Sequence, residues 1–133
     1  MALLVSAVLA QDAGVSDVQE RTQLTVQKDG ARVLKVRDSA KAKWRPFMQV
    51  SSEYTLEVID LTEDKEALVL LHNINAPAHA VEKNLKSGAE RDLLTADALK
   101  LVDADGGVAL TGTQDGGVML WRYDRKAKKF IVQ

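Results

Sequence analysis

The chain of 133 residues contains no cysteine. This absence excludes disulfide bonds, thiolate metal sites, a cysteine nucleophile and a lipid anchor on cysteine. Histidine is scarce as well, because His72 and His79 are the only two, and they lie seven residues apart across a proline. That spacing matches no zinc-binding motif. The sequence therefore predicts neither a metal site nor a cofactor.

Neither sign of charge is in excess. The chain has 18 Lys and Arg residues against 19 Asp and Glu, a formal net charge of −1. A dedicated nucleic-acid-binding protein is usually clearly basic, so nucleic acid is not the partner we expect. The hydrophobic fraction of 46% is ordinary for a folded protein, and a chain of this length can bury a core of its own. We therefore expect one globular domain.

Long hydrophobic runs are also missing, so we expect no transmembrane span. The largely apolar run Ala2–Ala10 has nine residues, which suits the apolar region of a secretory signal peptide and is too short to cross a bilayer. No basic residue precedes it, and the first is Arg21, so a buried strand or helical turn is the alternative. We predict a signal-like segment with a polar tether over residues 1–20, a β-rich domain over residues 21–133, and a secreted or periplasmic location, with a cytoplasmic one as the alternative.

Glycine is sparse, and half of the eight glycines fall in two copies of Asp-Gly-Gly-Val at residues 105–108 and 115–118. A calcium loop that starts at Asp103 would lack ligands at two required positions, which are occupied by Gly107 and Gln114. A phosphate-binding loop is excluded because no lysine lies in either copy and strand-forming residues follow. Glycine beside aspartate is typical of tight turns, so both copies predict turns between neighbouring strands.

Alternation of apolar and polar residues with a period of two dominates the chain after Arg21. Nine strand candidates follow from this pattern: Thr22–Gln27, Ala31–Val36, Trp44–Val50, Tyr54–Leu61, Ala67–Ile74, Leu99–Asp103, Val108–Thr113, Val118–Tyr123 and Phe130–Gln133. The Asp29-Gly30 pair predicts a hairpin between the first two. Pro46 lacks the backbone donor, which predicts a sheet edge or a strand entry for the third rather than a central position. The fifth is apolar on both faces, which predicts a central strand between layers.

Helical spacing occurs in one segment, residues 88–102, where Leu93, Leu94, Ala98 and Leu101 recur, and it centres on residues 88–100. We therefore predict one short helix there. Many short strands at regular spacing are typical of antiparallel sandwiches and barrels. The sequence predicts a mainly β fold: a single antiparallel β-sandwich or small barrel with a C-terminal meander and one short helix.

Two short stretches resemble known families. The stretch SEYTLEVIDLT (Ser52–Thr62) resembles a strand of the AMIN domains of periplasmic cell-wall and secretin proteins, which are small β-sandwiches. The stretches VIDLTEDKEALVLL and YDRKAKKFIVQ resemble strands of secreted β-propeller repeats. Thr55 stands where the AMIN pattern has arginine, Glu57 adds a residue, and the propeller's metal-binding motif is missing. We therefore assign no family from the sequence.

Basic residues gather in two clusters, 28–45 and 122–129, and aromatic residues are interleaved with both. Each tryptophan precedes an arginine, in Trp44-Arg45 and Trp121-Arg122. On an exposed sheet, arginine pairs with anions and indole offers a flat contact to sugars or bases. If the chain has a binding site, we expect these four residues to form it.

A structural alternative exists for the second cluster. Trp121 and Tyr123 are two residues apart, so both can point into the core while the neighbouring lysines keep the following turn soluble and protect an edge strand. We keep both interpretations of this cluster open at this stage.

No catalytic motif is present, since neither VSSEY nor KSGAE matches the G-x-S-x-G nucleophile elbow. We expect a non-catalytic, exported or envelope-associated binding or assembly module that contacts a protein or an anionic glycan, through its surface or an edge strand. One alternative is a small β-barrel hydrolase that uses the acidic cluster Glu53–Glu66. The other is a cytosolic barrel that binds single-stranded nucleic acid.

Overall fold

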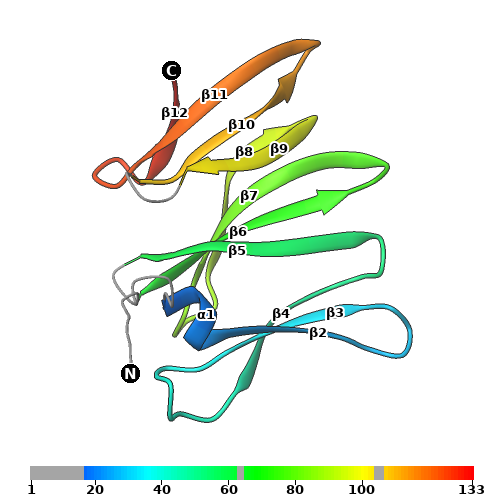
Figure 1. The fold of residues 1–133 in the computed structure, drawn as a ribbon, viewed down its shortest axis with the longest axis vertical. Coiled ribbons are helices and arrows are strands. Elements are labelled where there is room, and N and C mark those ends of the chain that lie inside the picture. Colours follow the sequence, from blue (N-terminus) through cyan, green and yellow to red (C-terminus); the bar gives the residue numbers. More distant parts are fainter. Residues whose placement is uncertain (1–16, 63–64, 104–106) are drawn as a thin grey trace, which may run out of the picture.

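The protein is built from three antiparallel sheets stacked as layers (Figure 1). The computed structural model describes residues 17–62, 65–103 and 107–133. The first sheet has three strands, β2 (Thr22–Val26), β3 (Arg32–Val36) and β4 (Arg45–Val50). The second has four, β5 (Tyr54–Thr62), β6 (Glu66–Asn73), β7 (Ala76–Asn84) and β8 (Glu90–Ala96). The third has β9 (Ala98–Asp103), β10 (Ala109–Gln114), β11 (Gly117–Asp124) and β12 (Lys129–Val132).

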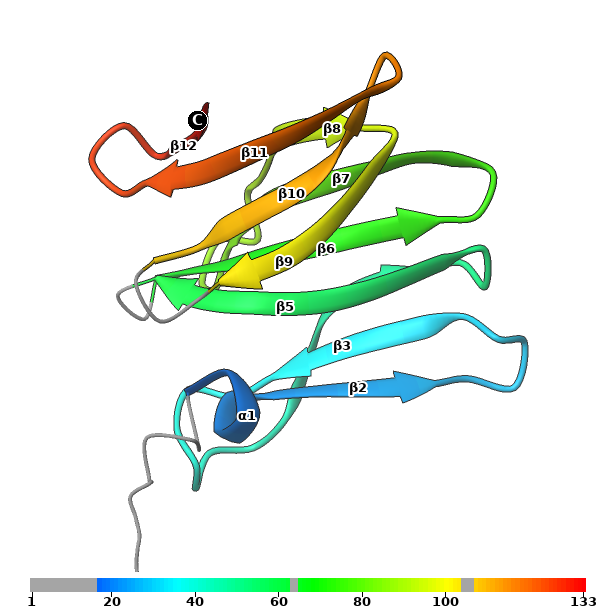
Figure 2. The same ribbon diagram turned by 45° about the horizontal axis from the view of Figure 1, so that its top comes forward.

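Strands that follow one another in the chain are neighbours in each sheet, so every sheet is a meander. The turned view in Figure 2 shows the first sheet below the second, and the third above it. The predicted mainly β, antiparallel fold and its C-terminal meander are confirmed. The described strands close into no barrel, and the arrangement is that of a layered sandwich.

The second sheet is buried on both faces, which explains the apolar character of β6. Leu68 and Leu70 belong to the core shared with the third sheet. Ala67 and Val69, which point the opposite way, belong to the core shared with the first sheet. All four are at most 1% exposed. The predicted central strand between layers is therefore confirmed.

The helix predicted over residues 88–100 is wrong, because this segment forms β8 and β9 with Asp97 between them. The pairing register of β8 on β7 shifts, so that Leu94 lies opposite Ala80 while Asp92 lies opposite Val81. Leu93 is the extra residue of this β-bulge. A bulge interrupts the alternation of side chains along a strand. The apolar residues of this segment therefore recur at a spacing that resembles that of a helix.

The one helix of the described residues is α1 (Asp17–Arg21), which lies where we expected the end of a polar tether. Val18 packs against the core of the first and second sheets. The Nε of Arg21 donates a hydrogen bond to the Arg37 carbonyl at 3.0 Å. The folded part therefore starts before the predicted boundary at Arg21. The predicted signal-like run Ala2–Ala10 lies outside the described residues.

The turn between β10 and β11 confirms the interpretation of the second Asp-Gly-Gly-Val copy. Gln114 pairs with Gly117, so the loop has two residues, Asp115 and Gly116. Both have positive φ, 51° and 81°, as the turns that suit the twist of a hairpin require. The first copy lies partly outside the described residues.

Candidate functional site

The four predicted site residues do not come together. Trp121 is 3% exposed and belongs to the core between the second and third sheets. Arg122, its neighbour on β11, is exposed on the outer face of the third sheet. Arg45 begins β4 in the first sheet, on the other side of the central sheet, and Trp44 directly precedes it. Because Trp121 is buried, its indole offers no surface contact, and the structural alternative for this residue is confirmed.

Trp44 and Arg45 have partners within the chain. The guanidinium of Arg37 lies 4.2 Å from the ring centroid of Trp44, a distance typical of a cation–π contact. Arg45 donates a 2.7 Å hydrogen bond to the carbonyl of Leu85, directly after β7, and lies 3.4 Å from Asp38. These contacts fix the start of β4 against the end of β7.

A groove runs beside the second half of β4. Its volume is about 440 Å³, and its walls come from the end of β4, the chain that follows it and the central sheet: Gln49, Val50, Ser51, Tyr54, Leu71, His79, Val81, Glu90 and Asp92. A smaller depression of about 210 Å³ lies along the same strand, lined by Val33, Pro46, Phe47, Met48, Gln49 and Lys83. Both open where β4 faces β7 and β8.

The groove exists because the first sheet is one strand narrower than the second. β4 is the last strand of the first sheet, so one of its edges has no neighbouring strand among the described residues. This confirms the edge position that Pro46 predicted. The side of β7 and β8 beyond this edge carries polar side chains, including His79, Lys83 and Glu90. A free strand edge and an uncovered sheet surface therefore lie side by side.

A cluster of three polar side chains stands at the groove. His79 Nδ1 lies 2.8 Å from Asp92 Oδ2 and 3.0 Å from Thr95 Oγ1. Thr95 Oγ1 also donates to Asp92 Oδ2 at 3.2 Å. Asp92 and Thr95 are three residues apart and would face opposite ways in a regular strand, but the bulge at Leu93 turns both toward His79. No sequence pattern indicated this cluster, because the segment that carries Asp92 and Thr95 was predicted to be a helix and forms β8.

His79 lines the groove, and its Nδ1 is engaged by Asp92 and Thr95. With Nδ1 held by a carboxylate, Nε2 of a neutral imidazole is the acceptor. No group of three or more His, Asp or Glu side chains is arranged to hold a metal ion in the described parts of the chain. The geometry thus supports hydrogen bonding to a ligand.

A second polar cluster is internal and joins the second and third sheets. Glu82 is 5% exposed, and its carboxylate accepts hydrogen bonds from the Tyr123 hydroxyl at 3.2 Å and from Arg91 at 3.1 Å. Arg91 also donates to the carbonyl of Lys128 at 2.8 Å. Burial, together with the charge of Glu82, raises the pKa of Tyr123 to about 12. A buried carboxylate needs such partners, so this cluster is structural.

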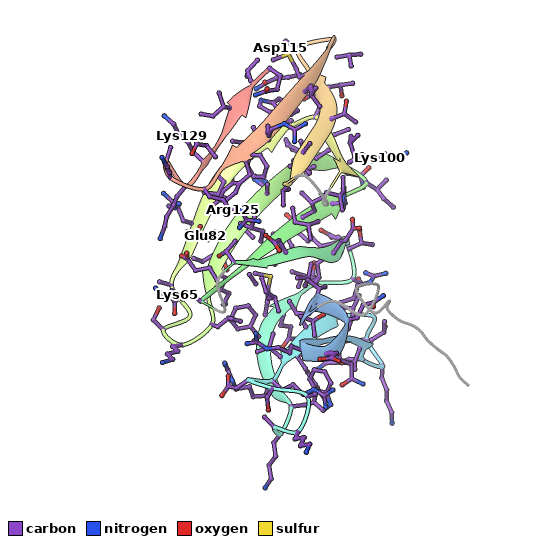
Figure 3. All side chains as sticks on the ribbon, turned by 60° about the vertical axis from the view of Figure 1, so that its left-hand side comes forward. Lys65, Glu82, Lys100, Asp115, Arg125 and Lys129 are labelled. Carbon is purple, nitrogen blue, oxygen red and sulfur yellow. The ribbon has the colours of Figure 1, made fainter. Side chains whose placement is uncertain are left out.

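A small cavity of about 130 Å³ lies beside this cluster, lined by Thr62, Lys65, Glu66, Tyr123, Arg125 and Lys128. Figure 3 labels Lys65, Glu82 and Arg125 in this region. Arg125 lies 3.0 Å from Asp60, and Lys128 lies 3.5 Å from Glu66. Two of the cavity's cations are therefore neutralised within the chain.

The acidic cluster Glu53–Glu66 gives the hydrolase alternative no support. Asp60 and Glu66 each pair with a cation of the third sheet. Glu53 and Glu57 are exposed, and Glu63 and Asp64 lie outside the described residues. Two carboxylates that face each other across a cleft are not found in the described part of this cluster.

Comparison with other proteins adds no assignment: no family model matches the sequence, and neither the curated proteins nor the solved structures yield a match. Among the described residues, no helix is long and apolar enough to cross a membrane.

Proposed function

We propose that this protein is a non-catalytic binding or assembly module that accepts an extended segment of a partner protein along the free edge of β4. The observation that carries the proposal is the edge of β4 that no described strand pairs, beside the groove of about 440 Å³. An added strand would form backbone hydrogen bonds with β4 and lay alternate side chains on β7 and β8. Strand addition of this kind is a recurrent mode of peptide recognition.

The lining of the groove supports this mode. Leu71 and Val81 provide an apolar floor, and Tyr54, His79 and Asp92 provide polar groups around it. An apolar surface with a few placed polar groups is typical of ligand sites. Backbone bonds to β4 would give affinity, and the two kinds of side chain would give specificity.

The position of Pro46 restricts where a strand can add. Proline has no backbone N–H, so the start of β4 offers fewer donors than its end. Arg45 and Trp44 are already held by contacts within the first two sheets. The register of β4 on β3 also shifts at Phe47, so pairing is concentrated on Met48–Val50, whose last two residues line the groove.

We also propose export to the periplasm or the exterior. This part of the proposal rests on the signal-like run Ala2–Ala10. A protein partner is favoured over an anionic glycan, because the groove lining contains the acids Glu90 and Asp92 and neither lysine nor arginine.

The absence of cysteine makes a site-specific test possible. In the variant Gln49→Cys, the single thiol lies in the groove wall and can carry a photoactivated crosslinker. The matched variant Gln23→Cys places the same group on β2, at the opposite edge of the first sheet. We expect a partner segment to be captured from Gln49→Cys alone. Equal capture from both positions would contradict the proposal.

A groove-filling substitution completes the experiment. Ser51 is exposed and lines the groove, so Ser51→Trp fills it without removing core contacts. Ser39→Trp, on an exposed loop, is the control for a general effect of added indole. We expect capture to be lost in the first variant and kept in the second. The captured segment, made as a synthetic peptide, should lose binding when its alternate amides are methylated.

A further inference from the structure

The outer face of the third sheet is a separate surface that the proposed function does not use. Residues 119, 121 and 123 of β11 point into the core, so residues 118, 120 and 122 point away from it. Val118 is 81% exposed and Leu120 is 39% exposed. No described element covers this face, which is the outermost layer in Figure 1.

Arg122 lies at the centre of this outer face. Its neighbours across the sheet are Ala109 on β10 and Ile131 on β12. Ile131 is 37% exposed. Arg122 thus has the exposed aliphatic side chain of Ile131 on one side and the buried Ala109 on the other, and within the described residues no salt bridge neutralises it. An arginine without an acidic partner on an apolar surface is suited to pair with a carboxylate from another molecule.

Other exposed cations belong to the third sheet and its last turn. Lys100, Lys126 and Lys129 are exposed, and Figure 3 shows Lys100 and Lys129 on opposite sides of the third sheet. No salt bridge of these three lysines is found in the described parts of the chain. Asp124, the acid nearest in sequence to Arg122, uses its Oδ1 to accept the backbone N–H groups of Lys126 and Ala127. Asp124 keeps its negative charge in these hydrogen bonds, but Arg122 and the exposed lysines outnumber it.

This face also has a shallow depression of about 470 Å³. It is lined by Arg122, Tyr123, Asp124, Arg125, Lys126, Ile131 and Gln133. Cations and an aliphatic side chain thus border the same concave site. A flat charged surface would not bring both kinds of side chain around one ligand.

The charges and side chains of this face favour some ligands over others. A second copy docked symmetrically would bring its Arg122 and Lys126 close to those of the first, and like charges repel. Sugars and bases need exposed rings to stack on, whereas the rings of Trp121 and Tyr123 face inward. We infer that this depression binds an acidic segment of a protein, whose carboxylates pair with Arg122 and Lys126 and whose aliphatic side chain packs on Ile131.

The test uses a fluorescein-labelled peptide of alternating glutamate and leucine, with an alternating lysine and leucine peptide as the control probe. Fluorescence anisotropy should show that the acidic peptide binds and that the basic peptide does not. Arg122→Glu and Lys126→Glu should each weaken binding by about tenfold, because each replaces an attraction with a repulsion. Lys41→Glu makes the same charge change on an exposed loop of the first sheet and should leave binding unchanged.

Two further arms separate the alternatives. Ile131→Ser should weaken binding of the acidic peptide. A purely ionic attraction would not depend on this aliphatic side chain. Ser51→Trp should have no effect, so failure at this face is distinguishable from failure at the β4 groove. If phosphatidylcholine vesicles with phosphatidylglycerol bind through Arg122 while the acidic peptide does not, the inference is overturned in favour of a membrane. Equal weakening by Lys41→Glu would overturn it as well.

Discussion

The hydroxyl of Tyr123 on β11 donates a hydrogen bond to Glu82 on β7, and the two atoms are 3.2 Å apart. This contact crosses from the third sheet to the second at the edge of their shared core. Because Arg91 and the Lys128 carbonyl extend the same network, the pair links the C-terminal meander to the central sheet.

Removal of the hydroxyl tests this link. Tyr123→Phe keeps the ring in the core and removes a hydrogen bond to a buried carboxylate, so we expect a loss of about 1–2 kcal/mol in the free energy of unfolding. Urea denaturation followed by tryptophan fluorescence measures it. Tyr54→Phe, which removes the chain's other phenol hydroxyl, is the control. An unchanged midpoint in Tyr123→Phe would show that the bond contributes nothing.

Alkaline pH should weaken the same contact. The pKa of Tyr123 is raised to about 12 in the folded protein, while an unfolded tyrosine ionises near about pH 10. Below about pH 10 the phenol is neutral in both states and its stabilisation is complete. As pH rises from about 10 to about 12, the unfolded state ionises first, and stability falls. Thermal denaturation across this range should show a steeper loss of Tm in the parent than in Tyr123→Phe.

The β-bulge in β8 should depend on Asp92. Its carboxylate accepts hydrogen bonds from Thr95 and the backbone N–H of Leu94, and it contacts His79. Asp92→Ala removes all three, and we expect a loss of about 1–3 kcal/mol together with a changed imidazole signal for His79 in NMR spectra. His72 is the internal reference. An unaltered His79 signal would mean that the cluster does not orient the ring.

Gly112 permits the close approach of β9 and β10. A Cβ at this position would lie 2.0 Å from the carbonyl oxygen of Ala98, which is backbone and cannot move aside. We expect Gly112→Ala to lower the free energy of unfolding by about 3 kcal/mol or more, since overpacking forces the backbone apart. At Gly117 the nearest atom is 3.6 Å away, an ordinary contact, so Gly117→Ala should cost much less. Similar losses in both variants would contradict this account.

Most of the fold was predictable because it depends on local patterns. Alternation located the strands that have one polar face, and Asp115-Gly116 marked a hairpin whose backbone needs positive φ. β7 was missed because Pro77 and His79 interrupt its pattern. Pro77 is tolerated since the pairing with β8 begins at Ala78, one residue later. β8 was missed because its bulge removes the period of two.

The candidate site was much less predictable. The sequence associated Trp121 with Arg122, but neighbours on a strand point to opposite faces, and a single strand does not say which face is the core. The groove arises from the difference between a three-stranded and a four-stranded sheet. That difference is a property of the assembled layers, and no segment of the chain encodes it locally.

The free edge of β4 is the central claim, and amide hydrogen exchange tests it most directly. In the isolated protein, the amides of Met48–Val50 that point away from β3 should exchange rapidly while those that bond to β3 stay protected, because no described strand pairs with the other edge of β4. Binding of the segment captured at Gln49→Cys should then protect these rapidly exchanging amides. Protection of all three amides in the free protein, or fast exchange that persists in the complex, would contradict strand addition at β4.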